Sequence, residues 1–195
     1  EYIPEVLQAV RPDSEGLQVI KAEPLCGARV DQPDGRLATI LKDHVLAAAG
    51  AEGLSSSTVA LVDHGTPAPE VNELRNAMAN QLNAEISESC LRVVPASMER
   101  RVGPEYDFNE PLLENLQSLH PEKPEDLIVA MFFLLPGRHA GPSGDVAEIC
   151  QGLRENAVFR NISMTGLIGE HPLLPEILHD RLQEAIKAAR LDEQN

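Results

Sequence analysis

The stretch that decides the predicted fold is Thr58–Val71, TVALVDHGTPAPEV. Its first five residues are an apolar, largely β-branched run of the kind that forms a buried strand, and this run ends at Asp63 and His64. A glycine, a threonine and two prolines then precede a helical pattern, which is the composition of a turn between a strand and a helix. A histidine in such a turn is too exposed to be a routine core residue. His64 is therefore the first candidate functional residue.

The alternation of strand-like and helix-like stretches continues along the chain. The predicted strands are Thr58–Val62, Cys90–Val94, Asp126–Leu135 and Asn161–Leu167. The third is an almost unbroken apolar run, which is typical of a central parallel strand buried on both faces. Strands separated by helices indicate right-handed crossovers and a parallel sheet. We therefore predict an α/β module over residues 58–190, with an open four-stranded parallel sheet and helices on both faces. If the strand order is 2-1-3-4, the first and third strands are neighbours.

The first 50 residues resemble the back half of a second copy of this module. Three segments match in the same order: 1–10 with 144–153, 23–27 with 165–169, and 37–45 with 174–182. An ordered set of matches indicates an internal duplication. Residues 1–50 are then a partial lobe of helix, strand (Leu17–Ala22) and helix, and residues 51–57 are a linker. Because a lone strand is not stable, this lobe must pack on the main module or on a lobe outside this chain.

Charge and cysteine usage exclude several classes of protein. Lys and Arg number 16 against 31 Asp and Glu, so the net charge of -15 gives no basic footprint for general nucleic-acid or anionic-membrane binding. The three cysteines, Cys26, Cys90 and Cys150, are far apart and form no C-x-x-C pair, which argues against a disulfide framework, a zinc ribbon and an iron–sulfur site. No apolar run approaches the roughly 18 residues of a membrane span. We expect a cytoplasmic protein with reduced thiols.

A second histidine follows the third predicted strand. His139 lies in LLPGRHAGPSGD, and in a sheet of order 2-1-3-4 its strand is the neighbour of the strand that ends before His64. Ligands of open parallel sheets bind beyond the carboxyl ends of such strands, so both imidazoles are expected to face one crevice. Neutral imidazole binds late first-row divalent metals and accepts protons near neutral pH. Two imidazoles without a third strong ligand suit a site that hands a metal on. The alternative is that each histidine caps a loop.

Three motifs together carry a resemblance to one enzyme family. VALVDHGTPAPEVNELRNAMANQL, IVAMFFLLPGRHAGPSGDVAEI and TGLIGEHPLLPEIL resemble segments of the class II tetrapyrrole chelatases, and most closely the sirohydrochlorin chelatases of the CbiX/SirB type. The resemblance covers residues 58–190 and, through the internal repeat, extends to residues 1–50. It implies a lyase that inserts Co²⁺ or Fe²⁺ into a sirohydrochlorin-type tetrapyrrole, without ATP, in cobalamin or siroheme biosynthesis.

The resemblance also implies roles for individual residues. His64 and His139 would bind the incoming divalent metal and accept the pyrrole protons, since two N–H protons must leave as the cation enters. Glu99 is the implied counterpart of a family glutamate after the second strand, as a metal relay or proton acceptor, and its alternative is a solvated loop residue. The metal is a substrate here. In agreement with ATP independence, the chain has no G-x-x-x-x-G-K-[ST] loop.

Other polar residues near these motifs have simpler expected roles. Asp63 stands where the family often has glycine or alanine, so it either orients the ring of His64 or caps the following turn. Asp145 is expected to interact with the N-terminus of a helix. The remaining histidines considered are His171, expected at a helix start, and His44 and His179, expected on the surface.

An acidic protein that binds a polycarboxylate needs local cations. Arg100, Arg101 and Arg138 are expected to bind the carboxylates of the tetrapyrrole, because guanidinium groups pair with carboxylates in two-point geometry. The alternative is that the Arg100 and Arg101 pair is only solvated.

Two further readings compete with a chelatase. A metal or tetrapyrrole carrier of the same fold stays open, and turnover distinguishes it from an enzyme. A phosphotransferase built on the His-Gly pair is disfavoured because Asp63 would repel phosphate. A homodimer and a missing upstream lobe both stay open as partners.

Overall fold

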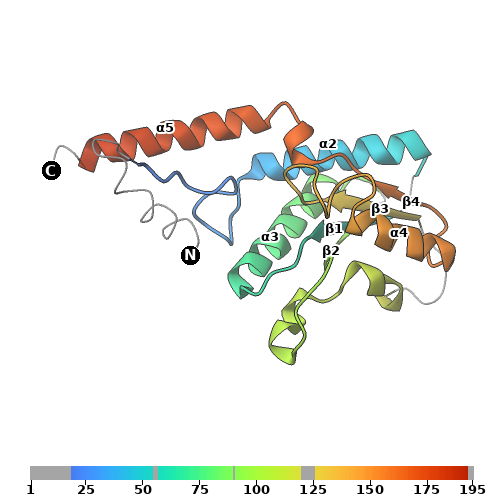
Figure 1. Cartoon of the computed structure of the whole chain (residues 1–195). Helices are drawn as coiled ribbons and strands as arrows, with labels where there is room; N and C mark the ends of the chain where they lie inside the picture. The colour runs from blue at the N-terminus through green and yellow to red at the C-terminus, as the bar shows by residue number, and fades with distance from the viewer. Residues whose placement is uncertain (1–18, 55–56, 90, 120–125, 193–195) are drawn as a thin grey trace.

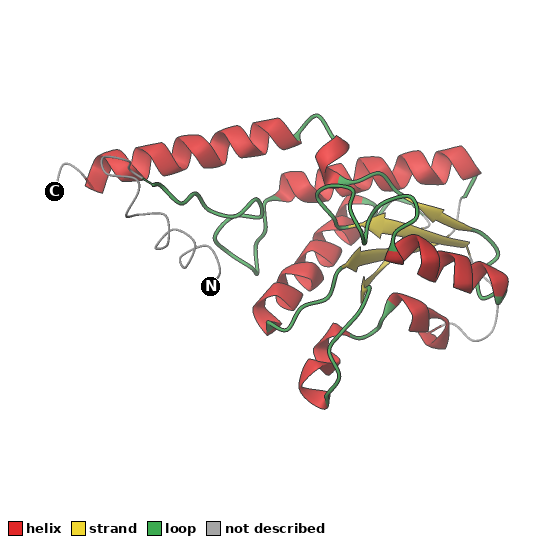
Figure 2. Cartoon of the chain, viewed as in Figure 1, coloured by secondary structure: helices red, strands yellow, loops and turns green. Residues whose placement is uncertain are grey.

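The computed structural model describes residues 19–54, 57–89, 91–119 and 126–192, and its core is a parallel sheet with helices on both faces (Figures 1 and 2). The sheet has four strands in the order β2-β1-β3-β4, and each neighbouring pair is parallel. The predicted α/β class and strand order are therefore confirmed. The strands are β1 (Ser57–Asp63), β2 (Leu91–Ser97), β3 (Asp126–Met131) and β4 (Ile162–Met164).

Strands β1 and β3 lie at the centre of the sheet because their sequences are apolar on both faces. Every residue of both strands is buried, whereas β2 is partly exposed and contains Pro95. An edge strand tolerates proline because only one of its edges forms hydrogen bonds. The two central strands pair from Ser57 with Asp126 to Val62 with Met131. This register places the chain that leaves β1 beside the chain that leaves β3.

Helices cover both faces of the sheet. They are α2 (Gly35–Glu52), α3 (Pro69–Glu85), α4 (Asp145–Glu155), α5 (Leu174–Asp192) and the 3-10 helices η2 (Pro104–Asn109), η3 (Leu113–Leu119) and η4 (Ile168–Glu170). Val59 and Leu61 of β1 face the core formed with α2 and α3, whereas Ala60 and Val62 face the core formed with α4 and η3. This alternation is the period of two of an extended strand. Along the described ranges, no helix combines the length and apolarity that a membrane crossing needs.

Helix α2 belongs to this module although it precedes the sheet in the sequence. Its apolar side chains enter the core formed with α3, β1 and β3, and they include Leu37, Ile40, Leu41 and Val45. Gly53, with φ of 66°, ends the helix in the left-handed conformation. Residues 51 and 52 of the predicted linker are therefore the last residues of α2, and residue 57 is the first of β1.

The predicted strand Leu17–Ala22 is wrong over its described residues, 19–22, which have no regular structure. A strand needs a neighbour to hydrogen-bond, and the edge of the sheet beyond β3 is taken by β4. Val19 and Ile20 are exposed instead. The helix that the repeat predicts over residues 1–10 lies outside the described residues.

Helix α5 starts on the module and then leaves it. Ile177, in its first turn, is buried against α2, while the helix beyond points away from the sheet (Figure 1). Two ion pairs join the starts of α2 and α5: Arg36 with Asp180 at 2.6 Å and Asp34 with Arg181 at 2.7 Å. The direction of α5 is therefore fixed at its base.

The described cysteines are free thiols, as expected. Cys26 is half-buried, and Cys150 is buried on the inner face of α4. Burial raises the pKa of the Cys150 thiol to about 11, so this thiol stays protonated at neutral pH. Cys90 lies outside the described residues.

Replacement of Ile40 tests whether α2 stabilises the sheet. Ile40→Ala removes a fully buried side chain from the core between α2, α3 and β3, and we expect the free energy of unfolding to fall by about 2–4 kcal/mol. Urea denaturation measures this loss. Leu46→Ala, on the exposed side of the same helix, is the matched control and should cost less than about 0.5 kcal/mol. Similar losses in both variants would contradict the packing of α2 on the sheet.

Candidate functional site

Two histidine rings meet at the carboxyl ends of the central strands. His64 follows β1 directly, and His139 follows β3 after a loop. This loop starts beside the end of β1, because Phe132 N donates to Val62 O. The centroids of the two imidazole rings are 4.6 Å apart, and the ring planes are inclined at 67°. Segments far apart in the sequence therefore present two nitrogen heterocycles to one site, at the switch point of the sheet.

The turn after β1 brings Glu99 beside His64. Met98 N donates to Asp63 O at 2.8 Å and Glu99 N donates to His64 O at 3.2 Å, so the two chains continue side by side beyond the sheet. Gly65 has φ of +91°, and a Cβ on it would lie 1.9 Å from Glu99 O. Only glycine fits this approach. As a result, Glu99 Oε1 lies 3.3 Å from His64 Nε2.

A buried polar network supports this turn from below. Asp63 Oδ1 accepts hydrogen bonds from Gly65 N at 3.1 Å and from Ser97 Oγ at 2.7 Å. Arg75 of α3 donates to Ser97 Oγ and lies 3.8 Å from the carboxylate of Asp63. Burial lowers the pKa of the Arg75 guanidinium below its usual value, and the charge of Asp63 opposes that shift. Of the two roles expected for Asp63, the structure shows the turn cap.

Asn109 fixes the same turn from η2. Its Oδ1 accepts from Thr66 N at 3.0 Å and its Nδ2 donates to Thr66 O at 2.9 Å, while its own carbonyl accepts from Arg75 Nη1 at 3.2 Å. Asn109 is completely buried. Our sequence reasoning missed Asn109 and Arg75. Arg75 carried a usable signal, because it lies four residues after Val71 and three before Met78, on the apolar face of the α3 pattern.

His139 is held by a carboxylate from the helix that follows it. Asp145 is the first residue of α4, and its Oδ2 lies 2.5 Å from His139 Nδ1. The loop folds back on this helix: Asp145 N donates to Arg138 O and Val146 N donates to His139 O, each at 3.2 Å. A Cβ at Gly144 would lie 2.7 Å from His139 O, so the close approach requires glycine. Asp145 was expected only to favour the helix N-terminus.

The contact with Asp145 assigns the nitrogens of His139. A carboxylate next to Nδ1 stabilises the proton on that atom, which leaves Nε2 as the lone-pair nitrogen of the neutral ring. In His64, Nδ1 lies 3.1 Å from Gly65 O, and a neutral ring that donates there keeps its lone pair on Nε2, beside the Glu99 carboxylate. In these tautomers both imidazoles present Nε2 to a cation or a proton.

Among the described residues, no group of three or more His, Cys, Asp or Glu side chains is arranged to hold a metal ion. The site instead offers two imidazoles, with Glu99 next to one of them. The side chains of His64 and Glu99 are about half exposed. This arrangement favours transient binding of a divalent cation over permanent retention.

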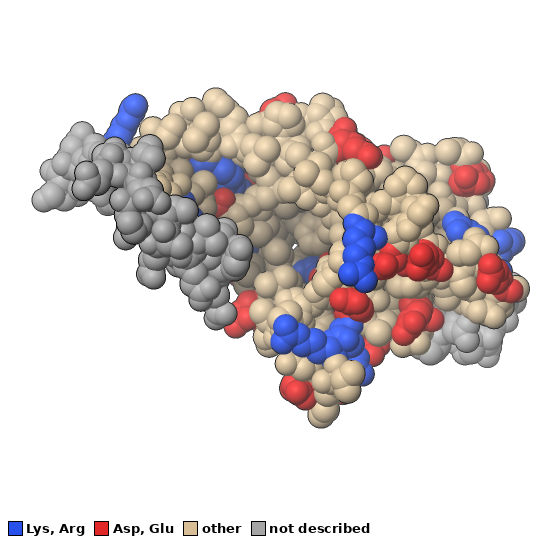
Figure 3. Space-filling model, in the orientation of Figure 1, with Lys and Arg blue, Asp and Glu red and all other residues tan. Residues whose placement is uncertain are grey.

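The three predicted arginines differ in how free they are. Arg100 contacts Glu110 at 2.8 Å and Asp107 at 3.2 Å, so its charge is balanced within its own loop. The guanidinium carbon of Arg101 lies 5.8 Å from the centre of the Tyr106 ring, a cation–π contact. The side chain of Arg138 is 85% exposed, and its Nε lies 3.8 Å from Asp145 Oδ2. The face in Figure 3 accordingly shows basic and acidic side chains intermixed and no continuous basic patch.

A cavity of about 560 Å³ lies beside the His139 loop, at the carboxyl ends of β3 and β4. Its walls are mostly apolar and come from the ends of β3 and β4, from the 136–142 loop and from the segment after β4; they include Met131, Ala140, Met164 and Leu167. Such a volume and lining are typical of a small-molecule site.

Two other histidines connect α2 to the segment after β4. His171 Nδ1 accepts from Leu173 N, and its Nε2 lies 3.3 Å from Asp43. His44 Nε2 contacts Leu167 O at 3.1 Å, and its ring packs edge-on against that of His171. The surface position expected for His44 is wrong, because α2 packs beneath this segment. The helix start expected for His171 is wrong, because this residue ends η4 and α5 begins only at Leu174. His179 is exposed, as expected.

Comparisons with known proteins support a family assignment. The CbiX family model matches residues 58–185. SirB from Bacillus subtilis with Fe³⁺ superposes with a TM-score of 0.64 at 19% identity, covering 94% of this chain and 64% of that one. The sirohydrochlorin chelatase SirB from Bacillus subtilis subspecies spizizenii in complex with cobalt gives 0.58 at 16% identity, covering 94% and 61%. The chain thus spans less than two thirds of either protein. No curated protein sequence is significantly similar to it.

Removal of the carboxylate beside His139 tests its role in metal binding. In Asp145→Asn the imidazole loses the negative charge beside Nδ1, and we expect Co²⁺ affinity, measured by calorimetry, to fall about 10- to 100-fold. Glu148→Gln removes the same charge from the first turn of α4 at an exposed position and should leave the affinity unchanged. If both variants weaken binding equally, the effect is one of net charge and the positioning role is excluded.

Asp63→Ala tests the buried network beneath His64. The variant leaves the Arg75 guanidinium buried without its carboxylate, so we expect the free energy of unfolding, measured in urea, to fall by about 3 kcal/mol. Glu99→Ala removes an exposed carboxylate from the adjacent loop and should change stability by less than about 0.5 kcal/mol. A loss below about 1 kcal/mol in Asp63→Ala would show that water replaces the ion pair.

Proposed function

The chain belongs to the CbiX family, and from this we propose that it inserts a divalent metal, Co²⁺ or Fe²⁺, into a sirohydrochlorin-type tetrapyrrole without ATP. The observation that carries the proposal is the pair of imidazoles at the ends of β1 and β3, with ring centroids 4.6 Å apart. The solved SirB proteins, whose fold this chain shares, hold Fe³⁺ in one case and cobalt in the other.

Metal capture falls to the two Nε2 atoms. Asp145 holds the Nδ1 proton of His139, and Gly65 O accepts from Nδ1 of His64, so both neutral rings offer the opposite nitrogen. Two neutral nitrogen ligands bind a late first-row cation without filling its coordination shell. The cation therefore keeps open positions for the pyrrole nitrogens that replace the imidazoles.

Proton removal uses the same nitrogens after the metal has passed to the macrocycle. Each pyrrole N–H that the cation displaces gives up a proton, and a free imidazole Nε2 accepts it. In His64 that nitrogen is 3.3 Å from Glu99 Oε1, so the protonated ring donates to Glu99. Glu99 is exposed and passes the proton to solvent. The His64 ring is then neutral again and can bind the next metal ion.

Substrate orientation depends on the cations and the apolar wall around the histidines. Arg138, directly before His139 and highly exposed, pairs with a peripheral carboxylate of the macrocycle, and Arg101 offers a second contact. Arg100 orders its loop through Asp107 and Glu110, so its role in binding is indirect. The cavity next to the His139 loop receives part of the apolar face of the ring system.

Turnover of a metal-free tetrapyrrole distinguishes an enzyme from a carrier. With excess sirohydrochlorin and Co²⁺, or Fe²⁺ under anaerobic conditions, the absorption spectrum should shift over many turnovers per protein. We expect His64→Ala and His139→Ala each to lower kcat/KM by at least about 100-fold, because both metal capture and proton transfer are lost. His179→Ala, exposed on α5, is the matched control and should behave as wild type.

The competing function predicts a different end point in the same assay. A metal or tetrapyrrole carrier of this fold gives a spectral change that stops at one equivalent per protein. That outcome, or full activity in both histidine variants, would reject the chelatase assignment.

A further inference from the structure

The segment of residues 100–110, which contains η2 and which we call the η2 loop, stands on the turn that carries His64. Its first end is joined to this turn through Glu99 N, which donates to His64 O at 3.2 Å. Its second end is joined through Asn109, whose side chain bonds to both the amide and the carbonyl of Thr66. The loop projects from the carboxyl end of β2 (Figure 1). A ligand much larger than a metal ion that binds at His64 therefore comes close to the η2 loop.

The tip of the η2 loop is an apolar side chain in contact with solvent. Val102 is 98% exposed, and among the described large apolar side chains the next most exposed is Leu135, at 63%. Leu135 lies on the loop that leaves β3 and carries His139. In the sheet order β2-β1-β3, the loops that leave β2 and β3 lie on either side of the turn that leaves β1. Because small-molecule sites are lined mainly by apolar groups, this placement indicates a ligand with an apolar surface.

Arg100 holds the η2 loop in one conformation. Its guanidinium donates to Glu110 Oε1 at 2.8 Å and to the carbonyl oxygens of Arg101 and Gly103, each at 3.2 Å. The backbone on either side of Val102 is fixed by the last two of these bonds. An apolar group held in this way loses little conformational entropy when a ligand covers it.

Aromatic side chains of η2 support Arg101, the neighbour of Val102. The guanidinium carbon of Arg101 lies 5.8 Å from the centre of the Tyr106 ring, and Tyr106 packs edge-on against Phe108 with ring centroids 6.5 Å apart. No carboxylate of the described residues forms an ion pair with Arg101, so its charge is available to an anion. Figure 3 shows basic side chains on this projecting segment. The η2 loop thus presents an apolar group and a cation next to each other.

We propose that the η2 loop binds one side of the tetrapyrrole and sets the affinity for it: Val102 packs against the face of a pyrrole ring, and Arg101 pairs with a carboxylate of the same ring. This inference rests on the proposed function, and it assigns the macrocycle a contact that the metal does not share. Val102 is three residues beyond Glu99, which is at most about 11 Å along an extended chain. A macrocycle centred on the imidazoles reaches over a comparable distance with its peripheral carboxylates.

Binding of a metal-free macrocycle tests the proposal without turnover. Sirohydrochlorin is titrated with the protein in the absence of metal, and its fluorescence reports Kd. We expect Val102→Ala to raise Kd about 5-fold, because the contact loses most of its apolar surface. Val102→Leu keeps an apolar tip and should bind as the wild type does. Because Val102 is exposed, neither substitution should lower the stability of the fold.

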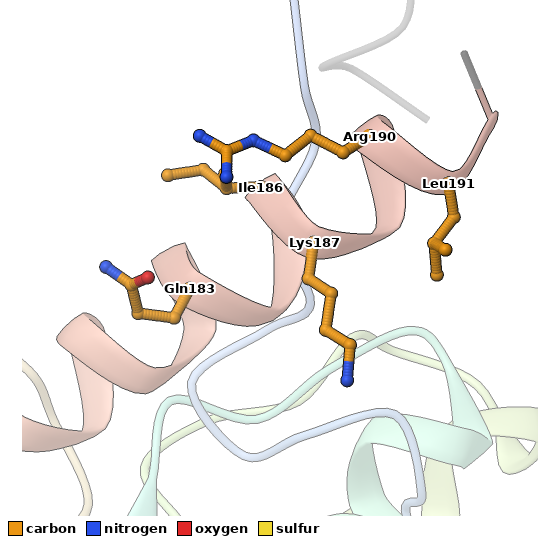
Figure 4. A pocket seen from close by; sticks show the side chains of 5 residues that line it. All are labelled: Gln183, Ile186, Lys187, Arg190 and Leu191. Atoms are coloured by element: carbon orange, nitrogen blue, oxygen red, sulfur yellow. The ribbon is translucent and has the colours of Figure 1, made fainter. Parts of the chain in front are cut away.

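The salt dependence of Kd separates the two contacts. Arg101→Ala should raise Kd about 3-fold at low ionic strength and have no effect in high salt, because exposed charge pairs are screened. The effect of Val102→Ala should persist in high salt, since salt does not screen an apolar contact. Arg190→Ala is the charge-matched control, because Arg190 is exposed on the last part of α5 (Figure 4), and it should leave Kd unchanged.

The affinity for Co²⁺ alone, measured by calorimetry, should be the same in Val102→Ala, Arg101→Ala and the wild type, because the η2 loop supplies no ligand to the metal. The proposal is overturned if Val102→Ala binds sirohydrochlorin as tightly as the wild type, if Arg101→Ala binds no more weakly than Arg190→Ala, or if Co²⁺ affinity falls in parallel. The expected changes in Kd without turnover would reject the chelatase function and leave the η2 loop as the binding element of a carrier. The two failures are therefore distinguishable.

Discussion

The parallel pairing of β1 with β3 is the interaction on which the rest of the structure depends. It joins Val62 to Met131, and the residues that follow these two carry His64 and His139. Both strands are fully buried, so the free energy that fixes this register comes from the apolar cores on the two faces of the sheet. A slip of the register would separate the imidazoles.

The two imidazoles are then held by different means. His64 sits on a turn whose backbone is fixed by buried groups, namely Asp63, Arg75 and Asn109. His139 sits on an open loop and is oriented through its side chain, by Asp145 at the start of α4. One position is set by the main chain and the other by a carboxylate, and in both rings the supporting contact is made at Nδ1. Such support around reactive groups keeps their geometry without occupying them.

The sequence predicted the features that depend on the pattern of apolar and polar residues along short segments. The apolar runs predicted the strands and their burial. The order 2-1-3-4, which brings His64 and His139 together, was an assumption that the sheet confirms. The contact of Asp145 with His139 could not be predicted, because it depends on how the intervening loop folds back. The strand predicted over Leu17–Ala22 had the right composition but needed a neighbour, and pairing is not a local property. Arg75 was missed because we did not ask why a charged residue lies on the apolar face of a helix.

The position of α2 has a consequence for synthesis on the ribosome. This helix covers β1 and β3, yet it emerges before either of them. About 80 residues separate its end from the end of β3, which at usual elongation rates corresponds to several seconds. During that interval its apolar side chains have no sheet to cover and are open to chaperones. The nascent chain is therefore most prone to aggregate before β3 leaves the exit tunnel.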